Sequence, residues 1–281
     1  MNKLALGTAQ FGLDYGVTNS EGKVQVEEVE LILGCAKENS INTLDTAASY
    51  GNSEEVLGSI GISDFQIITK TIPLKNGVDE VIKHFQQSLT FLNKSSVNGL
   101  LIHHFNEIEH KNFNTLFKEL TELKRQGLVN KIGFSTYTPE QVDFLLKNFD
   151  FDLIQVPFNI FDNRLIQGGQ LQALNNKGME VHARSVFLQG VLLDFNNLSN
   201  YFSPWKKEFS IYQEIVKDNG LSLLECALNF VLNIREIDKV LLGVNSERQL
   251  KEIVQAVKRR SNLSAYPIND INLLNPSLWK V

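Results

Sequence analysis

The stretch Leu44-Asp45-Thr46-Ala47-Ala48-Ser49-Tyr50-Gly51 places an acid and a phenol directly after a short apolar run. Residues 41–44 are typical of a buried strand, and the small and polar residues that follow indicate a turn at its end. In α/β folds the carboxyl ends of the strands collect the catalytic groups. We therefore expect Asp45 and Tyr50 to lie at the rim of a parallel sheet.

Two later apolar runs also end in a titratable residue. Residues 66–70 end at Lys70, and residues 99–103 end at His103. If these runs are the next two strands of the same sheet, an acid, a phenol, an amine and an imidazole share one rim. Each residue alone has a structural explanation, such as a turn cap or a surface position, so the hypothesis rests on the four together.

Strands and helices alternate along the whole chain of 281 residues. The predicted strands lie at residues 4–7, 41–45, 66–70, 98–103, 131–134, 151–156, 179–183 and 239–242. The predicted helices lie at residues 26–38, 53–61, 78–92, 113–128, 165–176, 211–216, 223–232 and 246–258, with a further helix that begins at Thr138-Pro139. Eight such units predict a single α/β domain, a closed (β/α)8 TIM barrel over residues 1–281. An open doubly wound sheet is the alternative, but no Gly-x-Gly-x-x-Gly follows a strand.

Local signals give two more expectations. Ser53 is expected to cap the helix that it begins, because serine side chains accept hydrogen bonds from the first helical amides. Residues 187–207 form the longest stretch without periodicity, and a loop after the seventh strand is expected to lie over the mouth of the barrel.

Composition and charge exclude several classes of protein. The formal net charge is -5 and the one basic run, Lys258-Arg259-Arg260, falls at a helix end, which disfavours a nucleic-acid partner. No apolar run approaches the roughly 18 residues of a membrane span, and residues 1–7 lack the core of a signal peptide. A cytoplasmic location is therefore expected. Cys35 and Cys226 lie in apolar helical segments and are expected to be reduced core residues.

The four rim residues suit one kind of chemistry. A nearby ammonium stabilises a phenolate, so Lys70 can make Tyr50 a better acid, and Asp45 can hold Lys70 charged and oriented. His103 can donate a hydrogen bond to a substrate oxygen as charge develops on it. The group fits a reaction in which a carbonyl oxygen gains a proton while its carbon gains a hydride. A metal is not expected at His103-His104 with Glu107, Glu109 and His110, because their spacing matches neither His-Glu-x-x-His nor a zinc-finger pattern.

Four stretches of the chain, in order, resemble the aldo-keto reductase family. These are residues 6–12 (Leu6-Gly7-Thr8-Ala9-Gln10-Phe11-Gly12), the Asp45-Thr46-Ala47 to Tyr50-Gly51 signature, Ile67-Ile68-Thr69-Lys70 and Leu101-Ile102-His103-His104. The resemblance implies a (β/α)8 barrel that reduces carbonyls with a nicotinamide cofactor. In this family's pattern Tyr50 is the general acid, and Lys70, Asp45 and His103 support it.

The resemblance extends to residues that would contact the nicotinamide. Gly133-Phe134-Ser135 is similar to the family's Gly-x-Ser motif, and Gln155, followed by Asn159, matches its glutamine. Gly7 and Thr8 belong to the first strand and its turn. Thr136 stands where many members have asparagine. Arg184 replaces a stacking aromatic residue; its guanidinium can also stack, or add charge near the pyrophosphate or substrate, or pair at a strand end.

Residues 242–250 resemble the family's segment around the adenosine phosphate. A helix that begins at Ser246 offers free N–H groups to a phosphate. Gly243 and Asn245 stand where several relatives have a cation. Arg248 is nearby and either substitutes for that cation or only balances the charge of the helix surface. NADP(H) is therefore preferred as the cofactor, with NAD(H) as the alternative. The cofactor residues expected from the resemblance are Gly7, Thr8, Ser135, Gln155, Arg184, Gly243, Asn245, Ser246, Arg248 and Gln249.

The substrate is expected to be a small aldehyde or ketone, and Arg184 and His104 favour a sugar-like or other polar one. Aromatic residues expected at the pocket, or in packing beneath its loops, are Phe11, Tyr15, Phe187, Trp205, Tyr266 and Trp279. Two other functions remain open. Lys70 could act as a Schiff-base nucleophile in a lyase, or the barrel could be a non-catalytic cofactor sensor. Nothing in the sequence fixes the oligomeric state.

Overall fold

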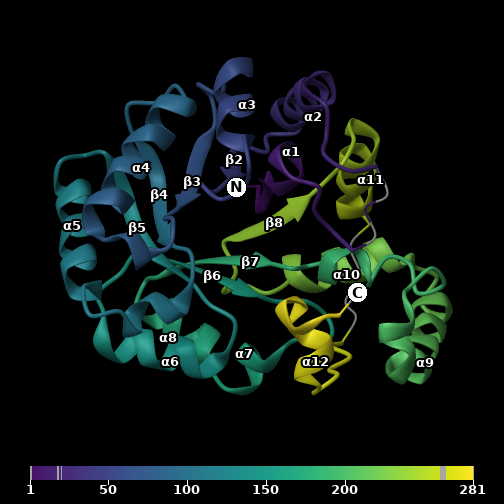
Figure 1. The fold of residues 1–281 in the computed structure, drawn as a ribbon. Coiled ribbons are helices and arrows are strands. Elements are labelled where there is room, and N and C mark those ends of the chain that lie inside the picture. Colours follow the sequence, from purple (N-terminus) through teal and green to yellow (C-terminus); the bar gives the residue numbers. More distant parts are fainter. Residues whose placement is uncertain (1, 18, 20, 260–263, 281) are drawn as a thin grey trace.

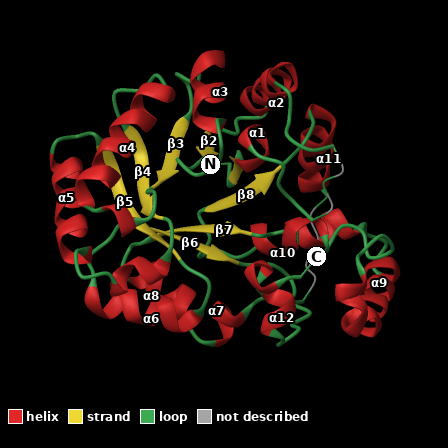
Figure 2. Ribbon diagram, in the orientation of Figure 1, coloured by secondary structure: helices red, strands yellow, loops and turns green. Residues whose placement is uncertain are grey.

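A closed barrel of eight parallel strands forms the centre of the molecule in the computed structural model, which describes residues 2–17, 19, 21–259 and 264–280. The helices surround the barrel, as Figures 1 and 2 show. The strands follow each other around the barrel in chain order, so the predicted (β/α)8 fold is confirmed and the open sheet is excluded. They are β1 Leu4–Gly7, β2 Thr43–Asp45, β3 Gln66–Lys70, β4 Val97–Ile102, β5 Val129–Ser135, β6 Leu153–Pro157, β7 Glu180–Arg184 and β8 Lys239–Gly243.

The barrel closes between its first and last strands. Gly7 at the end of β1 is in register with Asp45 of β2 on one side and with Gly243 of β8 on the other. The carboxyl ends of β8, β1 and β2 therefore meet at one place on the rim.

Twelve α-helices and five short 3-10 segments lie within the described residues. The helices are α1 Ala9–Gly12, α2 Val26–Glu38, α3 Ser53–Ile60, α4 Val78–Phe91, α5 Phe113–Arg125, α6 Pro139–Asn148, α7 Arg164–Gln167, α8 Gln170–Asn176, α9 Lys206–Asp218, α10 Leu223–Leu232, α11 Glu247–Lys258 and α12 Ile271–Leu274. The 3-10 segments are η1 Leu74–Asn76, η2 Phe105–Glu109, η3 Leu188–Gly190, η4 Asn200–Trp205 and η5 Pro276–Leu278. None of these helices is long and apolar enough to cross a membrane.

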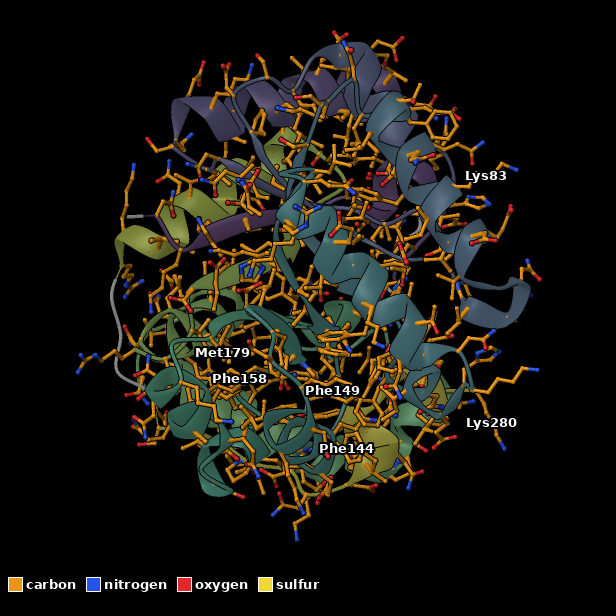
Figure 3. All side chains as sticks on the ribbon, turned by 90° about the vertical axis from the view of Figure 1, so that its left-hand side faces the viewer. Lys83, Phe144, Phe149, Phe158, Met179 and Lys280 are labelled. Atoms are coloured by element: carbon orange, nitrogen blue, oxygen red, sulfur yellow. The ribbon has the colours of Figure 1, made fainter. Side chains whose placement is uncertain are left out.

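The apolar faces predicted from the helical period pack on the barrel. Phe149, which follows α6, lies against Phe134 of β5 with ring centroids 5.6 Å apart and against Phe144 of α6 at 6.3 Å. Figure 3 shows Phe144 and Phe149 together in this layer. Cys35 and Cys226 are buried and free, as expected. The Thr138 side chain caps α6, whose first residue is Pro139, again as expected.

Two predicted elements were wrong in detail. The single helix expected at residues 165–176 is two helices, α7 and α8, because Gly169 adopts a left-handed conformation with a φ of 80° between them. Ser53 does not cap α3. It is the first helical residue, and its Oγ donates to the backbone oxygen of Thr8 at 2.9 Å and lies 2.8 Å from Thr8 Oγ1.

Candidate active site

Lys70 is the centre of a buried polar group at the carboxyl ends of β2 and β3. Its Nζ donates to Asp45 Oδ2 at 2.6 Å, to the Thr46 backbone oxygen at 2.8 Å and to the Tyr50 hydroxyl at 3.3 Å. The Lys70 side chain is 1% exposed and that of Asp45 is 5% exposed. An ammonium has three protons to donate, and here each finds an acceptor.

The charge state of Lys70 follows from these contacts. Burial disfavours the ammonium, but the negative charge of Asp45 and the oxygen of Tyr50 outweigh that cost, and the pKa of Lys70 is raised. Lys70 therefore stays positively charged beside the phenol. A positive charge at this position stabilises a phenolate relative to a phenol.

Tyr50 is held by close contact between α1 and the turn after β2. Gly51 adopts a φ of 57°, and a Cβ on Gly12 would lie 1.8 Å from the Tyr50 backbone oxygen. Two glycines thus let the backbones touch at the point where the phenol is presented. The bonds from Ser53 Oγ to Thr8 join the same turn to the end of β1.

His103 follows β4 and faces Tyr50. Its Nδ1 lies 3.2 Å from Ser49 Oγ, and its ring meets the Tyr50 ring edge-on with centroids 5.8 Å apart. Burial, together with the positive charges of Lys70, His104 and Arg184, lowers the pKa of His103 to about 2. At neutral pH His103 is therefore an uncharged hydrogen-bonding group.

The second oxygen of Asp45 has a partner that the sequence did not reveal. Gln155 Nε2, on β6, donates to Asp45 Oδ1 at 2.7 Å, and both side chains are buried. Asp45 thus receives hydrogen bonds from Lys70 on one oxygen and from Gln155 on the other. The contact joins residues 110 positions apart, so no local pattern could indicate it.

A cavity of about 360 Å³ runs from this group to the start of α11. Asp45 and Tyr50 line one end, and Asn245, Gln249 and Glu252 line the other. Seven of the ten predicted cofactor residues line it: Gly7, Thr8, Gln155, Arg184, Gly243, Asn245 and Gln249. Residues on its wall that the sequence did not single out for the cofactor include Gln10, Ser185, Gln189 and Glu252.

Three predicted cofactor residues do not line the cavity. Ser135 is buried at the end of β5, in register with Gln155. Ser246 caps α11, and its Oγ accepts from the Gln249 amide at 3.3 Å. The Arg248 side chain is 82% exposed, and its Nε lies 3.8 Å from Glu252. Asn159, expected near the nicotinamide, is buried and donates to the Ser185 backbone oxygen at 3.1 Å.

Arg184 lies on the cavity wall with its guanidinium fixed. One nitrogen donates to the Thr136 backbone oxygen at 2.9 Å, another lies 3.3 Å from Ser185 Oγ, and the group stacks over the Tyr137 ring at 4.3 Å. No carboxylate of the described residues forms an ion pair with it, so the strand-end salt bridge is not formed. Thr136 Oγ1 is buried without a partner in the described structure.

The six aromatic residues expected at the pocket or beneath its loops divide into two groups. Tyr15 and Phe187 line the cavity, and Phe187 comes from the long loop after β7. The other four pack elsewhere. Phe11 is fully buried, and Trp205 donates to Asp270. Tyr266 packs against Phe161, and Trp279 packs against Phe202.

The comparisons with known proteins agree with this geometry. The family model described as the aldo/keto reductase family matches residues 3–275. An uncharacterized oxidoreductase of Bacillus subtilis, YqkF, is 26% identical over 92% of this chain and 92% of its own length. The L-galactose dehydrogenase of Arabidopsis thaliana is 25% identical over 94% of this chain and 86% of its own.

Solved structures share the fold. An aldo-keto reductase from Bacillus halodurans, in its holo form, superposes with a TM-score of 0.74 at 20% identity, covering 94% of this chain and 88% of that one. A glycerol dehydrogenase from Gluconobacter oxydans gives 0.73 at 20% identity, covering 93% and 88%. The match of the family model across nearly the whole sequence confirms the resemblance of the motifs. The chain belongs to the aldo/keto reductase family, whose members are oxidoreductases that use nicotinamide cofactors.

Proposed function

We propose that the protein reduces the carbonyl of a small aldehyde or ketone to an alcohol with a nicotinamide cofactor, on one domain that spans residues 1–281. Tyr50 is the general acid in this proposal. The observation that carries it is the contact of one buried ammonium, Lys70 Nζ, with both Asp45 and the Tyr50 hydroxyl.

The cavity suits an elongated, polar cofactor. Its volume falls in the usual range of small-molecule sites, roughly 300–1,000 Å³, and it extends away from Tyr50 toward α11. Amide side chains line it at both ends, with Gln155 near Asp45 and Asn245 and Gln249 near α11. Asn245 Oδ1 is buried without a donor in the described structure, an acceptor that a cofactor hydroxyl or amine would satisfy.

Each residue of this group has a separate role in the proposed reaction. When bound, the cofactor supplies a hydride to the carbonyl carbon. Tyr50 donates its proton to the carbonyl oxygen, and the charged Lys70 stabilises the phenolate that results. Asp45 holds Lys70, and Gln155 holds Asp45. Neutral His103 binds the same oxygen by a hydrogen bond without competing as an acid. Solvent then returns a proton to Tyr50, so one proton and one hydride are consumed for each alcohol formed.

The Schiff-base alternative fits less well. A nucleophilic lysine must be uncharged, whereas Lys70 is buried with a raised pKa and all three of its protons directed at acceptors. The sensor alternative would be supported by cofactor binding without turnover of any carbonyl compound.

Substitution of Tyr50→Phe tests the proposal. It removes the donated proton while keeping the ring, so kcat should fall by about 10²–10⁴-fold, the usual contribution of a general acid. The Kd of the reduced cofactor should stay within about twofold. The measurements are oxidation of NADH and of NADPH with a panel of aldehydes and ketones, and titration of each cofactor by tryptophan fluorescence.

The matched control is Tyr201→Phe, which removes a hydroxyl that bonds to the Asn272 backbone oxygen outside the cavity. That variant should keep full activity. Undiminished turnover by Tyr50→Phe would remove Tyr50 from its role, and the failure of both reduced cofactors to bind would overturn the proposed function.

A further inference from the structure

The backbone amides at the start of α11 already have acceptors within the protein. The Asn245 N–H donates to Gln249 Oε1 at 2.8 Å, and the Gln249 N–H donates to Ser246 Oγ. The Glu247 N–H donates to Glu28 Oε1 at 2.6 Å. A helix N-terminus binds a phosphate through free N–H groups, and here two of the first three helical amides are taken.

The acceptor for the Glu247 N–H is a carboxylate that belongs to another helix. Glu28 lies in the first turn of α2, which packs beside α11 (Figure 1). Its oxygen therefore occupies the anion position at this helix end, with the short distance typical of a charge-assisted hydrogen bond. A second anion at the same end finds the Glu247 N–H already bonded and is repelled by the negative charge of Glu28.

The other charged residues at the start of α11 do not offset the negative charge of Glu28. Glu252 lines the cavity, while Arg248 is exposed beside it. Lys251 is 57% exposed and pairs with Glu247 at 2.8 Å. Neither cation lines the cavity, so within the described residues the wall near α11 offers a carboxylate and amides and no positive charge.

The direction of the cofactor follows from the catalytic group. Tyr50 lies at one end of the cavity, so a nicotinamide ring that reacts there leaves the adenosine half at the end lined by Asn245, Gln249 and Glu252. NADP(H) carries a phosphate on the adenosine ribose where NAD(H) has a hydroxyl. A hydroxyl can donate to Glu252 or to Asn245 Oδ1, whereas a phosphate is an acceptor only.

We propose that the protein selects NAD(H) over NADP(H), and that Glu28 is a specificity-determining residue that excludes the 2′-phosphate. This inference rests on the proposed function and reverses the NADP(H) preference that Arg248 suggested in the sequence. Arg248 points to solvent, and the helix end to which it belongs is already bound to an acid.

Binding of the two reduced cofactors to the intact protein tests the inference. At low salt the Kd of NADH should be on the order of tenfold lower than that of NADPH, because the repulsion between the 2′-phosphate and the Glu28 carboxylate is large enough to produce that ratio. Raising the salt should narrow the difference, since the repulsion is screened. Glu28→Gln keeps an oxygen that can accept from Glu247 but removes the charge. This substitution should lower the Kd of NADPH by roughly three- to tenfold and change the Kd of NADH by no more than about twofold.

Glu30→Gln is the matched control, because Glu30 is an exposed acid on the same helix. It should leave the ratio of the two Kd values unchanged. Equal or tighter binding of NADPH by the wild type, or a ratio that Glu28→Gln does not alter, would overturn the inference while leaving the proposed reductase intact. Binding of neither cofactor would overturn both.

Discussion

His103 shows how the charge of one residue depends on its neighbours. It is partly buried, and Lys70, His104 and Arg184 all place positive charge near it, so its pKa is about 2 instead of the ordinary 6.5. An imidazolium there would repel Lys70 and weaken its hold on Tyr50. A neutral imidazole can bind the substrate oxygen over the whole physiological pH range.

This shift predicts how stability depends on pH. Between pH 6.5 and about 2 the unfolded chain binds a proton at His103 that the folded protein does not. The free energy of unfolding should therefore fall as pH is lowered from 6.5, by at most about 1.4 kcal/mol per pH unit. His103→Gln should remove this part of the slope. Urea unfolding between about pH 7 and about pH 5 measures it.

That pH range separates His103 from Glu180. The pKa of Glu180 is lowered to about 2 from 4.5, first by its hydrogen bond to His182, so its contribution is lost only below 4.5. His84→Gln, which changes a histidine of α4 whose side chain is 40% exposed, serves as the control. Parallel pH dependence of the wild type and His103→Gln would show that His103 does not set the slope.

At the residue scale the sequence indicated the groups that stand at strand ends. Asp45, Tyr50, Lys70 and His103 each follow an apolar run, and the barrel brings such positions together. Contacts between distant elements could not be predicted in this way. The bonds from Gln155 to Asp45 and from Glu247 to Glu28 depend on side-chain reach across neighbouring elements. The sequence placed Arg248 near the start of a helix but did not show that its side chain is exposed, because a position on a helix does not fix the direction of the side chain.

Among the elements, α1 and the turn after β2 lie in direct backbone contact beside the site. A Cβ added at Gly12 would lie 1.8 Å from the Tyr50 oxygen and 2.5 Å from the Ser53 nitrogen. These are backbone atoms, so the two segments must separate to admit a methyl group. The presentation of Tyr50 therefore depends on a residue that takes no part in the chemistry.

Substitution of Gly12→Ala should test that coupling. We expect a loss of stability of about 1–3 kcal/mol, as for an overpacked site, together with a lower kcat because Tyr50 moves relative to Lys70. Gly34→Ala on α2 is the control, since its Cβ meets nothing within 4 Å and alanine favours a helix. Denaturant unfolding and steady-state kinetics provide the two measurements. An unchanged kcat in Gly12→Ala would show that the contact does not position the phenol.

Element positions followed from periodicity wherever side chains alternate between core and solvent. The break between α7 and α8 was missed because an apolar pattern continued across Gly168 and Gly169, although the second glycine adopts a left-handed conformation. The stretch at residues 187–207 was rightly expected to be irregular, and Phe187, Gln189 and Gly190 from it line the cavity. Its short helical segments have no sequence period long enough to detect.

At the scale of the whole molecule, the closed ring of strands makes the fold a single cooperative structure. Every strand pairs with two neighbours, so none can leave without breaking two ladders. We expect thermal unfolding in one transition. NADH at about 100 times its Kd should stabilise the folded state by about 2.7 kcal/mol and raise the Tm. Tyr50→Phe should show the same shift, because it keeps the cofactor site.

Differential scanning calorimetry with and without NADH provides the measurement. Two separate transitions would contradict the single cooperative barrel, and an NADH shift that Tyr50→Phe abolishes would place the phenol in cofactor binding. The barrel itself was predictable from the count of alternating units, whereas the bond from the Glu247 amide to Glu28 was not, because it depends on how α2 and α11 pack.

The pairing of Gly7 with Gly243 also bears on how the protein is made. Both residues line the cavity, one from the first strand and the other from the last. A nascent chain therefore presents Asp45, Tyr50 and Lys70 long before the opposite wall has been synthesised. For a nicotinamide cofactor that binds as proposed, the site is incomplete on a growing chain, so such a cofactor can favour the folded form only after nearly all of the sequence has left the ribosome.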